Sequence, residues 1–309
     1  TQGVSSAASD VYKRQVVHPY ASAAYAAAFA PRETVALPAA RTHVILRPID
    51  GSEAVDAMGC YPVCVFDGHD GLGADLASLA TRGVVSLVLV TDCLTQPEAA
   101  FLERHFDCVR PFKTHYVYDR TQPDTDYSKH HRDRVRLARR SCQTRVIDLA
   151  SHLDAWCACY DTLVARHGIT GIQAFGRSYF EAVSRMPDVT TIGAFEGDVL
   201  VSAHIWMRFG TFVYAHLAAS TDRGYKLRSA FAIYDHAVQL FGGECVIDFG
   251  GGAGTASSED DGLAAFKRGF ANGERRNFLC GRVLDRAVYD QLSRGREADD
   301  YFPAYRRAL

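Results

Sequence analysis

The sequence lacks the long apolar runs and cysteine pairs that mark several classes of protein. No run of apolar residues reaches 18, so we predict no membrane-spanning helix. None of the nine cysteines belongs to a C-x-x-C pair, and most lie in apolar stretches. We therefore expect buried, reduced thiols, a cytoplasmic location and no metal site. The net charge of −2 argues against a strongly basic nucleic-acid-binding protein, although a local basic patch stays open.

What the sequence does contain is enough apolar material for sizeable cores. Its 309 residues are 48% hydrophobic and 23% charged, as in a globular protein of two ordinary domains or one large one. Residues 1–15 have no apolar core of the kind found in signal peptides, and they resemble translated sequencing adaptor. We expect them to contribute nothing to the fold.

The most informative stretch covers residues 245–270 and predicts a strand, a glycine-rich loop and a helix. Residues 245–249 form a short apolar run around Asp248, as in a buried strand. Glycines follow at 250, 251, 252 and 254, where the chain turns or where a ligand lies against the backbone. Ser257 and Ser258 are candidate helix caps. In the helix, Leu263 and Phe266 share a face with Phe270. The glycines match neither G-x-G-x-x-G nor the P-loop pattern.

Two residues of this stretch carry alternative interpretations. Lys267 follows Phe266 at the edge of the apolar face. It is either a fixed positive charge suited to a developing oxyanion or a surface lysine with a buried stem. Asp248 either orients or deprotonates an attacking amine, or accepts hydrogen bonds from the glycine loop.

Predicted strands and helices alternate along the N-terminal part of the chain. This mixed pattern is enough for one small domain, and the polar residues 121–126 form a candidate linker. The predicted strands are 44–46, 62–66, 84–90 and 110–118, and the predicted helices are 73–81 and 96–106.

A basic helix is predicted next, over residues 128–140 with Ser128 as its N-cap. Between Tyr127 and Val146 there are seven Lys or Arg residues and one Asp. Such a run is either a solvated face or a surface for phosphates.

The remaining elements follow an informative order, which is helix, helix, three strands, helix, strand, helix, strand. We place the helices at 153–166, 177–185, 227–241 and near 262–270, and the strands at 189–195, 199–208, 212–218, 245–249 and 277–284. Glycine turns join the three consecutive strands into an antiparallel meander.

These motifs resemble the FemABX-like branch of the GNAT acyltransferase superfamily. Residues 248–251 (DFGG) and 262–270 (GLAAFKRGF) resemble its D-x-G-G and G-L-x-x-F-K-x-G-F motifs. Residues 128–140 are similar to its K-x-H-R helix. The resemblance implies an α/β (α+β) fold of tandem GNAT-like domains, each with a mixed, mostly antiparallel sheet and flanking helices. It places a degenerate first copy at 16–126, an acyltransferase domain at 127–292 and a polar tail at 293–309.

The resemblance also assigns site residues. It implies that Lys267 stabilises an oxyanion, and with it we assign Phe266 and Asp248 to catalysis. An acyl donor would lie where the chain splays around strand 212–218, near the start of the following helix. That start keeps basic residues but lacks the spaced glycines usual in acyl-CoA enzymes. The predicted donor-binding residues are Arg223, Gly224, Lys226, Arg228, Gly250 and Gly251.

The implied activity is transfer of an acetyl or aminoacyl group onto an amine. The donor is acyl-CoA or aminoacyl-tRNA, which makes tRNA a further expected partner, and the acceptor is a small-molecule or peptide-like amine. The alternative is a non-catalytic GNAT-fold protein that binds RNA or a nucleotide-linked ligand.

Overall fold

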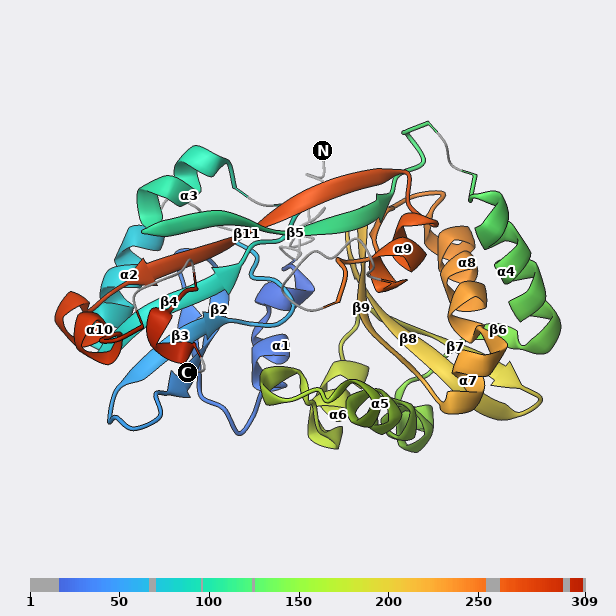
Figure 1. The fold of residues 1–309 in the computed structure, drawn as a ribbon, viewed down its shortest axis with the longest axis horizontal. Helices are drawn as coiled ribbons and strands as arrows, with labels where there is room; N and C mark the ends of the chain where they lie inside the picture. Colours follow the sequence, from blue (N-terminus) through green and yellow to red (C-terminus); the bar gives the residue numbers. More distant parts are fainter. Residues whose placement is uncertain are drawn as a thin grey trace, which may run out of the picture.

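A single mixed sheet organises the computed structural model, which describes residues 17–66, 71–95, 97–123, 126–253, 262–296 and 301–307. Its 11 strands lie in the order β1-β2-β3-β4-β11-β5-β10-β9-β8-β7-β6 (Figure 1). The pairs β3–β4 and β9–β10 are parallel, and the other neighbouring pairs are antiparallel. The predicted α/β class with a mostly antiparallel sheet is confirmed.

The first half of the chain forms one arm of this sheet. Its strands are β1 (Thr34–Leu37), β2 (Thr42–Pro48), β3 (Val55–Gly59), β4 (Val84–Val90) and β5 (Cys108–Tyr118). Its helices are α1 (Ala23–Ala27), α2 (Leu72–Thr81) and α3 (Ala99–His105). Strand β4 is found where it was predicted, whereas β1 and β3 were missed. Residues 62–66, predicted as a strand, contribute only an isolated bridge from Cys64 to Thr91.

The reason for the error at β3 is that its sequence, VDAMG, has little β propensity. Pairing with β2 on one side and β4 on the other makes it a strand. Its Asp56 is fully buried and forms ion pairs with Arg47 and Arg306. Local sequence patterns do not predict partners that lie this far away along the chain.

The second half follows the predicted order of elements, with Ser128 capping α4 as expected. Its helices are α4 (Lys129–Ser141), α5 (Leu153–His167), α6 (Arg177–Ser184), α7 (Asp222–Leu227), α8 (Ser229–Phe241), α9 (Gly262–Arg268) and α10 (Arg286–Leu292). Its strands are β6 (Gln143–Ile147), β7 (Val189–Glu196), β8 (Val199–Phe209), β9 (Phe212–Ser220), β10 (Val246–Asp248) and β11 (Gly273–Val283). The meander β7–β8–β9 is confirmed, and β6 adds an edge strand to it.

The sheet does not stop at the boundary predicted between residues 126 and 127. Strand β11, from the end of the chain, pairs with both β4 and β5 of the first half. Residues 301–307 pack beyond it, and the hydroxyl of Tyr305 hydrogen-bonds Ser86 at 2.7 Å and Asp56 at 3.0 Å. Residues 301–307 of the predicted polar tail therefore pack against the first half of the chain. The division into folding units at residue 126 stays a prediction.

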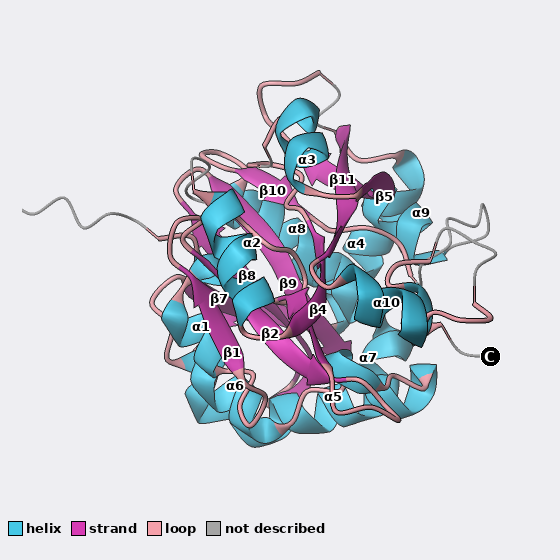
Figure 2. Ribbon diagram, turned by 90° about the vertical axis from the view of Figure 1, so that its left-hand side faces the viewer, coloured by secondary structure: helices cyan, strands magenta, loops and turns pink. Residues whose placement is uncertain are grey.

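Helices cover both faces of the second half's sheet (Figures 1 and 2), and apolar side chains fill the space between them and the sheet. One core lies under α1, α5 and α6 and includes Tyr214 of β9. Another lies under α4, α8 and α9 and includes Val213 of the same strand. Within the described residues, no helix is long and apolar enough to cross a membrane.

Candidate functional site

The sheet opens between β9 and β10, where the resemblance places the acyl donor. Strand β10 pairs with only the first three residues of β9, and the last pair joins Asp248 to Tyr214. Beyond Tyr214, β9 continues to Ser220 paired with β8 alone, and an extra residue at His216 bulges its backbone. Directly beside Asp248, one edge of β9 therefore has no strand paired with it.

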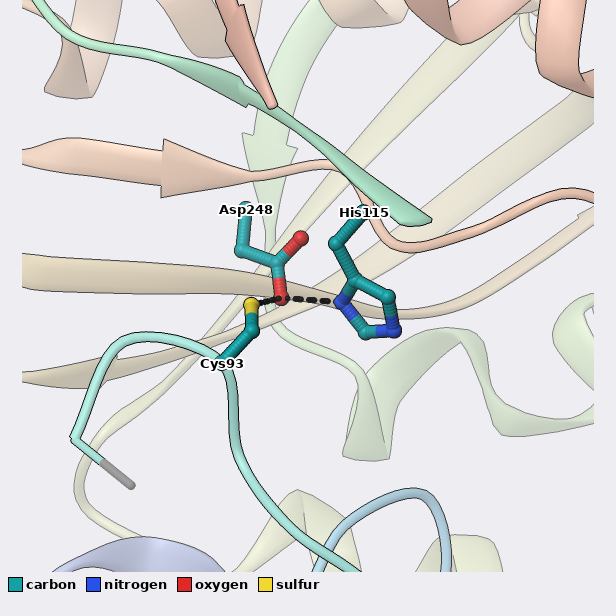
Figure 3. A group of neighbouring side chains, drawn as sticks. All are labelled: Cys93, His115 and Asp248. Atoms are coloured by element: carbon teal, nitrogen blue, oxygen red, sulfur yellow. Dashed lines mark hydrogen bonds and ion pairs between the residues drawn. The ribbon is translucent and has the colours of Figure 1, made fainter. Parts of the chain in front are cut away.

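Asp248 is only 4% exposed and holds a compact set of hydrogen bonds (Figure 3). Its Oδ2 accepts from His115 Nδ1 at 2.8 Å and from the Cys93 thiol at 3.6 Å. Its Oδ1 accepts from the amide of Gly250 at 2.7 Å. Three segments far apart in the sequence thus meet on one carboxylate.

The hydrogen bonds around Asn277 determine the protonation of His115. The backbone amide of Lys113 donates to Asn277 Oδ1 at 2.8 Å, so the amide nitrogen of Asn277 faces His115. That nitrogen donates to His115 Nε2 at 3.0 Å. Because Nε2 accepts, the ring proton that faces Asp248 lies on Nδ1, which donates to the carboxylate.

This environment keeps Asp248 ionised and Cys93 protonated. Burial alone would raise the pKa of Asp248, but His115, the Gly250 amide and Lys267 outweigh it and lower that pKa. Burial, followed by the charges of Asp248 and Asp92, raises the pKa of Cys93. Cys93 is therefore a hydrogen-bond donor to the carboxylate and not a thiolate nucleophile.

The same three side chains have the composition of a metal site, since their ligand atoms all lie within 4.8 Å of one another. A metal ion on His115 Nδ1 would move the ring proton to Nε2. That proton would then face the amide N–H of Asn277, with two donors opposed. We therefore interpret the group as a hydrogen-bonded network and assign no metal to it.

Lys267 meets the glycine loop as the motif predicts. Its Nζ donates to the carbonyl of Gly251 at 2.7 Å. Gly250 has a φ of +79°, and a Cβ there would lie 3.1 Å from Nζ. A side chain at Gly250 would thus be strained and would crowd the ammonium. The structure therefore brings together four of the predicted residues, namely Asp248, Gly250, Gly251 and Lys267.

Phe266 lies in a different environment from its neighbour. Its ring packs 4.8 Å from that of Phe231 and 4.7 Å from that of Tyr234. Its carbonyl accepts from His131 Nε2 of the basic helix α4 at 2.9 Å. A Cβ on Gly269 would come within 1.9 Å of the His131 ring. The two family-like motifs are thus in direct contact, and Phe266 holds α9 in position.

The predicted donor-binding residues of α7 lie elsewhere. Arg223 pairs with Glu196 in a bidentate ion pair, Lys226 is exposed, and Arg228 joins α7 to α8 with a φ of 58°. A Cβ on Gly224 would lie 2.2 Å from the carbonyl of Val201. Strand β9 separates α7 from Tyr214 and Asp248 by roughly 20 Å. The structure does not bring these four residues to the Asp248 site.

Several site residues were missed from the sequence. His115 and Asn277 are polar residues inside predicted strands, and Asp92 and Cys93 directly follow the buried strand β4. A buried polar residue in an apolar strand is the signal that could have found them. The proposed helix caps Ser257 and Ser258 lie outside the described residues, as do Gly254 and residues 1–15.

Comparison with known proteins shows a likeness in fold. No protein-family model matches the chain, and no curated protein sequence does. FemX has 13% identity and a TM-score of 0.58 over 81% of this chain and 86% of its own. The C-terminal domain of a putative lysylphosphatidylglycerol synthetase from Agrobacterium fabrum has 13% identity and a TM-score of 0.63, over 89% and 93%. L-PGS from Bacillus licheniformis has 11% identity and a TM-score of 0.57, over 85% and 91%. The chain therefore has the FemABX/GNAT-like fold that its motifs predicted.

Proposed function

We propose that this chain is an N-acyltransferase that moves an acetyl or aminoacyl group onto an amine. The observation that carries the proposal is the position of Lys267. Its ammonium group lies on the glycine loop beside the buried Asp248, where β9 and β10 part. A cation held against a backbone carbonyl in a partly buried place acts at a low effective dielectric constant and stabilises charge that develops in a transition state.

In the proposed reaction, the nitrogen of the acceptor attacks the acyl carbonyl carbon. A C–N bond forms, and negative charge develops on the carbonyl oxygen next to the Lys267 ammonium. Collapse of the tetrahedral intermediate breaks the bond to the leaving group, which departs as a thiol from CoA or as a ribose hydroxyl from tRNA. The leaving group takes up one proton, and the amine nitrogen gives one up.

Asp248 acts in this proposal as a positioning residue. It already accepts hydrogen bonds from His115, Cys93 and Gly250, and its pKa is lowered, so it is a weak base. Its charge instead fixes the start of the glycine loop and orients Lys267. Phe266 contributes by packing α9 against α8.

The donor is acyl-CoA or aminoacyl-tRNA, and both are polyanions that a basic surface would favour. Arg132, Arg136 and Arg139 of α4 line a groove of about 500 Å³ between α4 and α8. Arginine recognises phosphate through its planar set of donors. The likeness to the C-terminal domain of a putative lysylphosphatidylglycerol synthetase supports the aminoacyl donor, because that name contains a lysyl group. None of the nine cysteines is in a disulfide, which fits a reducing, cytoplasmic location.

Direct assay of acyl transfer tests the proposal. The purified chain is incubated with isotope-labelled acetyl-CoA or with aminoacyl-tRNA and a panel of diamines, lysine peptides and amino sugars. Labelled amide is then measured by mass spectrometry. We expect amide formation from one donor class that requires the enzyme. Absence of amide with every donor and acceptor would reject the proposal.

The second candidate function is a non-catalytic protein that binds RNA or a nucleotide-linked ligand. The arginines of the α4–α8 groove favour it, since they would serve binding without turnover. Salt-dependent RNA binding with no amide formation from any donor would support this candidate.

A further inference from the structure

A second buried carboxylate, Asp92, lies on the same face of the sheet as Asp248. It is 1% exposed. Its Oδ2 accepts three hydrogen bonds, at 3.0 Å from the Tyr214 hydroxyl and at 2.8 and 2.7 Å from the amide and hydroxyl of Thr95. Its Oδ1 is buried and has no hydrogen-bond partner in the described part of the chain. Buried carboxylate oxygens are rarely left without a partner, so this atom points to a bound group.

The charges around Asp92 are unbalanced. Tyr214, which holds Asp92, pairs in register with Asp248, and Cys93 joins the two carboxylates in sequence and in space. Burial, and then the charge of Asp248, raise the pKa of Asp92. Lys267 is placed to offset the charge of Asp248. Among the described residues, no cation forms an ion pair with Asp92, so the region accommodates one more positive charge.

A directed chain of hydrogen bonds beside Asp92 leaves Tyr20 with no proton to donate. Tyr25 donates to the carbonyl of Tyr61, so it must accept from Tyr179. Burial lowers the pKa of His216 to about 3, so its ring is neutral. Because Tyr179 donates to Tyr25, it accepts from His216 Nε2, and His216 Nδ1 accepts from Tyr20. The hydroxyl proton of Tyr20 is therefore committed to His216.

Tyr214 is committed in the same way, because its proton goes to the carboxylate of Asp92. The rings of Tyr20 and Tyr214 lie 5.6 Å apart, and both side chains are buried. Toward any further ligand, the two hydroxyl oxygens and Asp92 Oδ1 therefore offer lone pairs only. A ligand that binds here must bring the donors.

We propose that Asp92 binds a primary ammonium group of the substrate, with the hydroxyl oxygens of Tyr20 and Tyr214 as further acceptors. An ammonium supplies three N–H donors and the missing positive charge, and aromatic rings attract cations. The edge of β9 beyond Tyr214 has no paired strand on the side of β10. The assignment of this group to a reacting substrate rests on the proposed acyl transfer, whereas the binding itself does not.

The ammonium group can belong to the acceptor amine or to an aminoacyl donor, and matched probes distinguish these sources. Acceptor-like n-butylamine is compared with n-butanol, and donor-like L-alaninamide is compared with propanamide. Affinities are measured by isothermal titration calorimetry on the full chain. We expect at least one amine to bind about tenfold or more tightly than its uncharged isostere, because a charge-assisted hydrogen bond is lost in the isostere.

The variant Asp92→Asn sharpens the test without removing the packing. Three donors converge on Oδ2, so the amide oxygen of Asn takes that place. Its NH₂ group then replaces Oδ1 and opposes the ammonium. We expect amine binding to weaken about tenfold or more, while binding of the isosteres stays unchanged. Asp198→Asn, in the exposed β7–β8 turn, is the matched control and should leave all affinities unchanged.

The inference is wrong if wild-type protein binds amines no better than their isosteres, a result that does not depend on how the variant folds. It is also wrong if a folded Asp92→Asn variant keeps its preference for amines. Acyl transfer without discrimination of the amine probes would reject this inference and leave the proposed function standing. Preferential binding of amines without any acyl transfer would support this inference and reject the proposed function.

Discussion

The segments that follow β10 and β9 both contain glycine and both adjoin basic residues, but they are built differently. After β10, Asp248 accepts from His115, which is distant in sequence, and the turn of Gly250 and Gly251 meets Lys267 of the following helix. After β9, Arg223 pairs with Glu196 on the surface, and Gly224 packs against a neighbouring backbone. The turn after β10 buries charged groups. The segment after β9 has an exposed ion pair and a glycine that its close packing requires.

This difference separates a candidate site from a structural turn. Burying an ionised group costs desolvation free energy unless the group is fully hydrogen-bonded. Keeping Asp248 and Lys267 together therefore lowers the stability of the fold unless their partners compensate. Exposed ion pairs such as Arg223–Glu196 carry no such cost and contribute little. Burial of the charged groups, more than the presence of glycine, distinguishes the two turns.

The largest expected effect is on turnover when the charge of Lys267 is removed. Lys267→Met keeps most of the stem and deletes the ammonium, so the rate should fall roughly 100- to 1,000-fold, as for loss of an oxyanion partner. Lys267→Arg should rescue part of the rate, because a guanidinium is a planar fork and not a point charge. Single-turnover rates with the identified donor measure this.

The control for Lys267 is Lys226→Met in α7, where the lysine is exposed. Its rate should match that of the parent protein. Equal losses in Lys226→Met and Lys267→Met, or no loss in either, would contradict the distinction between the two turns.

The next effect is on stability when Asp248 loses its charge. In Asp248→Asn, an NH₂ group replaces one carboxylate oxygen. This NH₂ then faces another donor, which is either the Gly250 amide at Oδ1 or His115 and Cys93 at Oδ2. Loss of a buried charged acceptor costs about 2–3 kcal/mol, seen as a lower free energy of unfolding in urea. Asp222→Asn, an exposed aspartate in α7, is the matched control and should stay near the parent value. If Asp248→Asn lowers the free energy of unfolding no more than Asp222→Asn does, the stabilising role assigned to Asp248 is wrong.

The stability that Asp248 contributes should also depend on pH. Because its pKa is lowered in the folded state, the unfolded chain binds the proton more readily, and stability rises with pH. The contribution is complete above the ordinary aspartate value of 3.8 and is lost as the pH falls through the folded pKa. The difference in the free energy of unfolding between the parent and Asp248→Asn should therefore shrink as the pH falls below about 3.8. A difference that widens on acidification would reverse the assigned sign.

A smaller loss is expected at Gly224, which is structural in this comparison. Gly224→Ala would place a Cβ 2.2 Å from the Val201 carbonyl, so the backbone must shift. We expect a cost of about 1–3 kcal/mol in urea unfolding. Gly262→Ala is the control, since no atom lies within 4 Å of its added Cβ. An unchanged stability for Gly224→Ala would leave that glycine available for another role.

The smallest effect is expected at the surface pair. Arg223→Ala removes the ion pair with Glu196, which is exposed on both sides, and should leave the melting temperature unchanged. If Arg223 binds the donor, the same variant raises KM for the donor with kcat unchanged. An increased KM would restore α7 to the site.

Local patterns in the sequence predicted much of the fold. Apolar periodicity located the meander β7–β8–β9, the helix α8 and the strand β4, because these elements bury regular faces. The motif analysis placed the glycine loop and Lys267 in one strand, loop and helix segment, and the structure joins them through the hydrogen bond from Lys267 to Gly251. Strand β3 was missed because its neighbours, and not its own residues, make it a strand.

The tertiary structure alone decided which groups surround the carboxylate. His115, Cys93 and Asn277 come from β5, from the residues after β4 and from β11, and β11 reaches its place from the far end of the chain. Residue spacing carries no information on such pairings, because a sheet can order its strands in many ways. The sequence by itself determined the strand, loop and helix that hold Asp248 and Lys267. The sheet determined that Asp248 is buried among polar partners and that Arg223 is not, because burial depends on what the rest of the chain places on top of a residue.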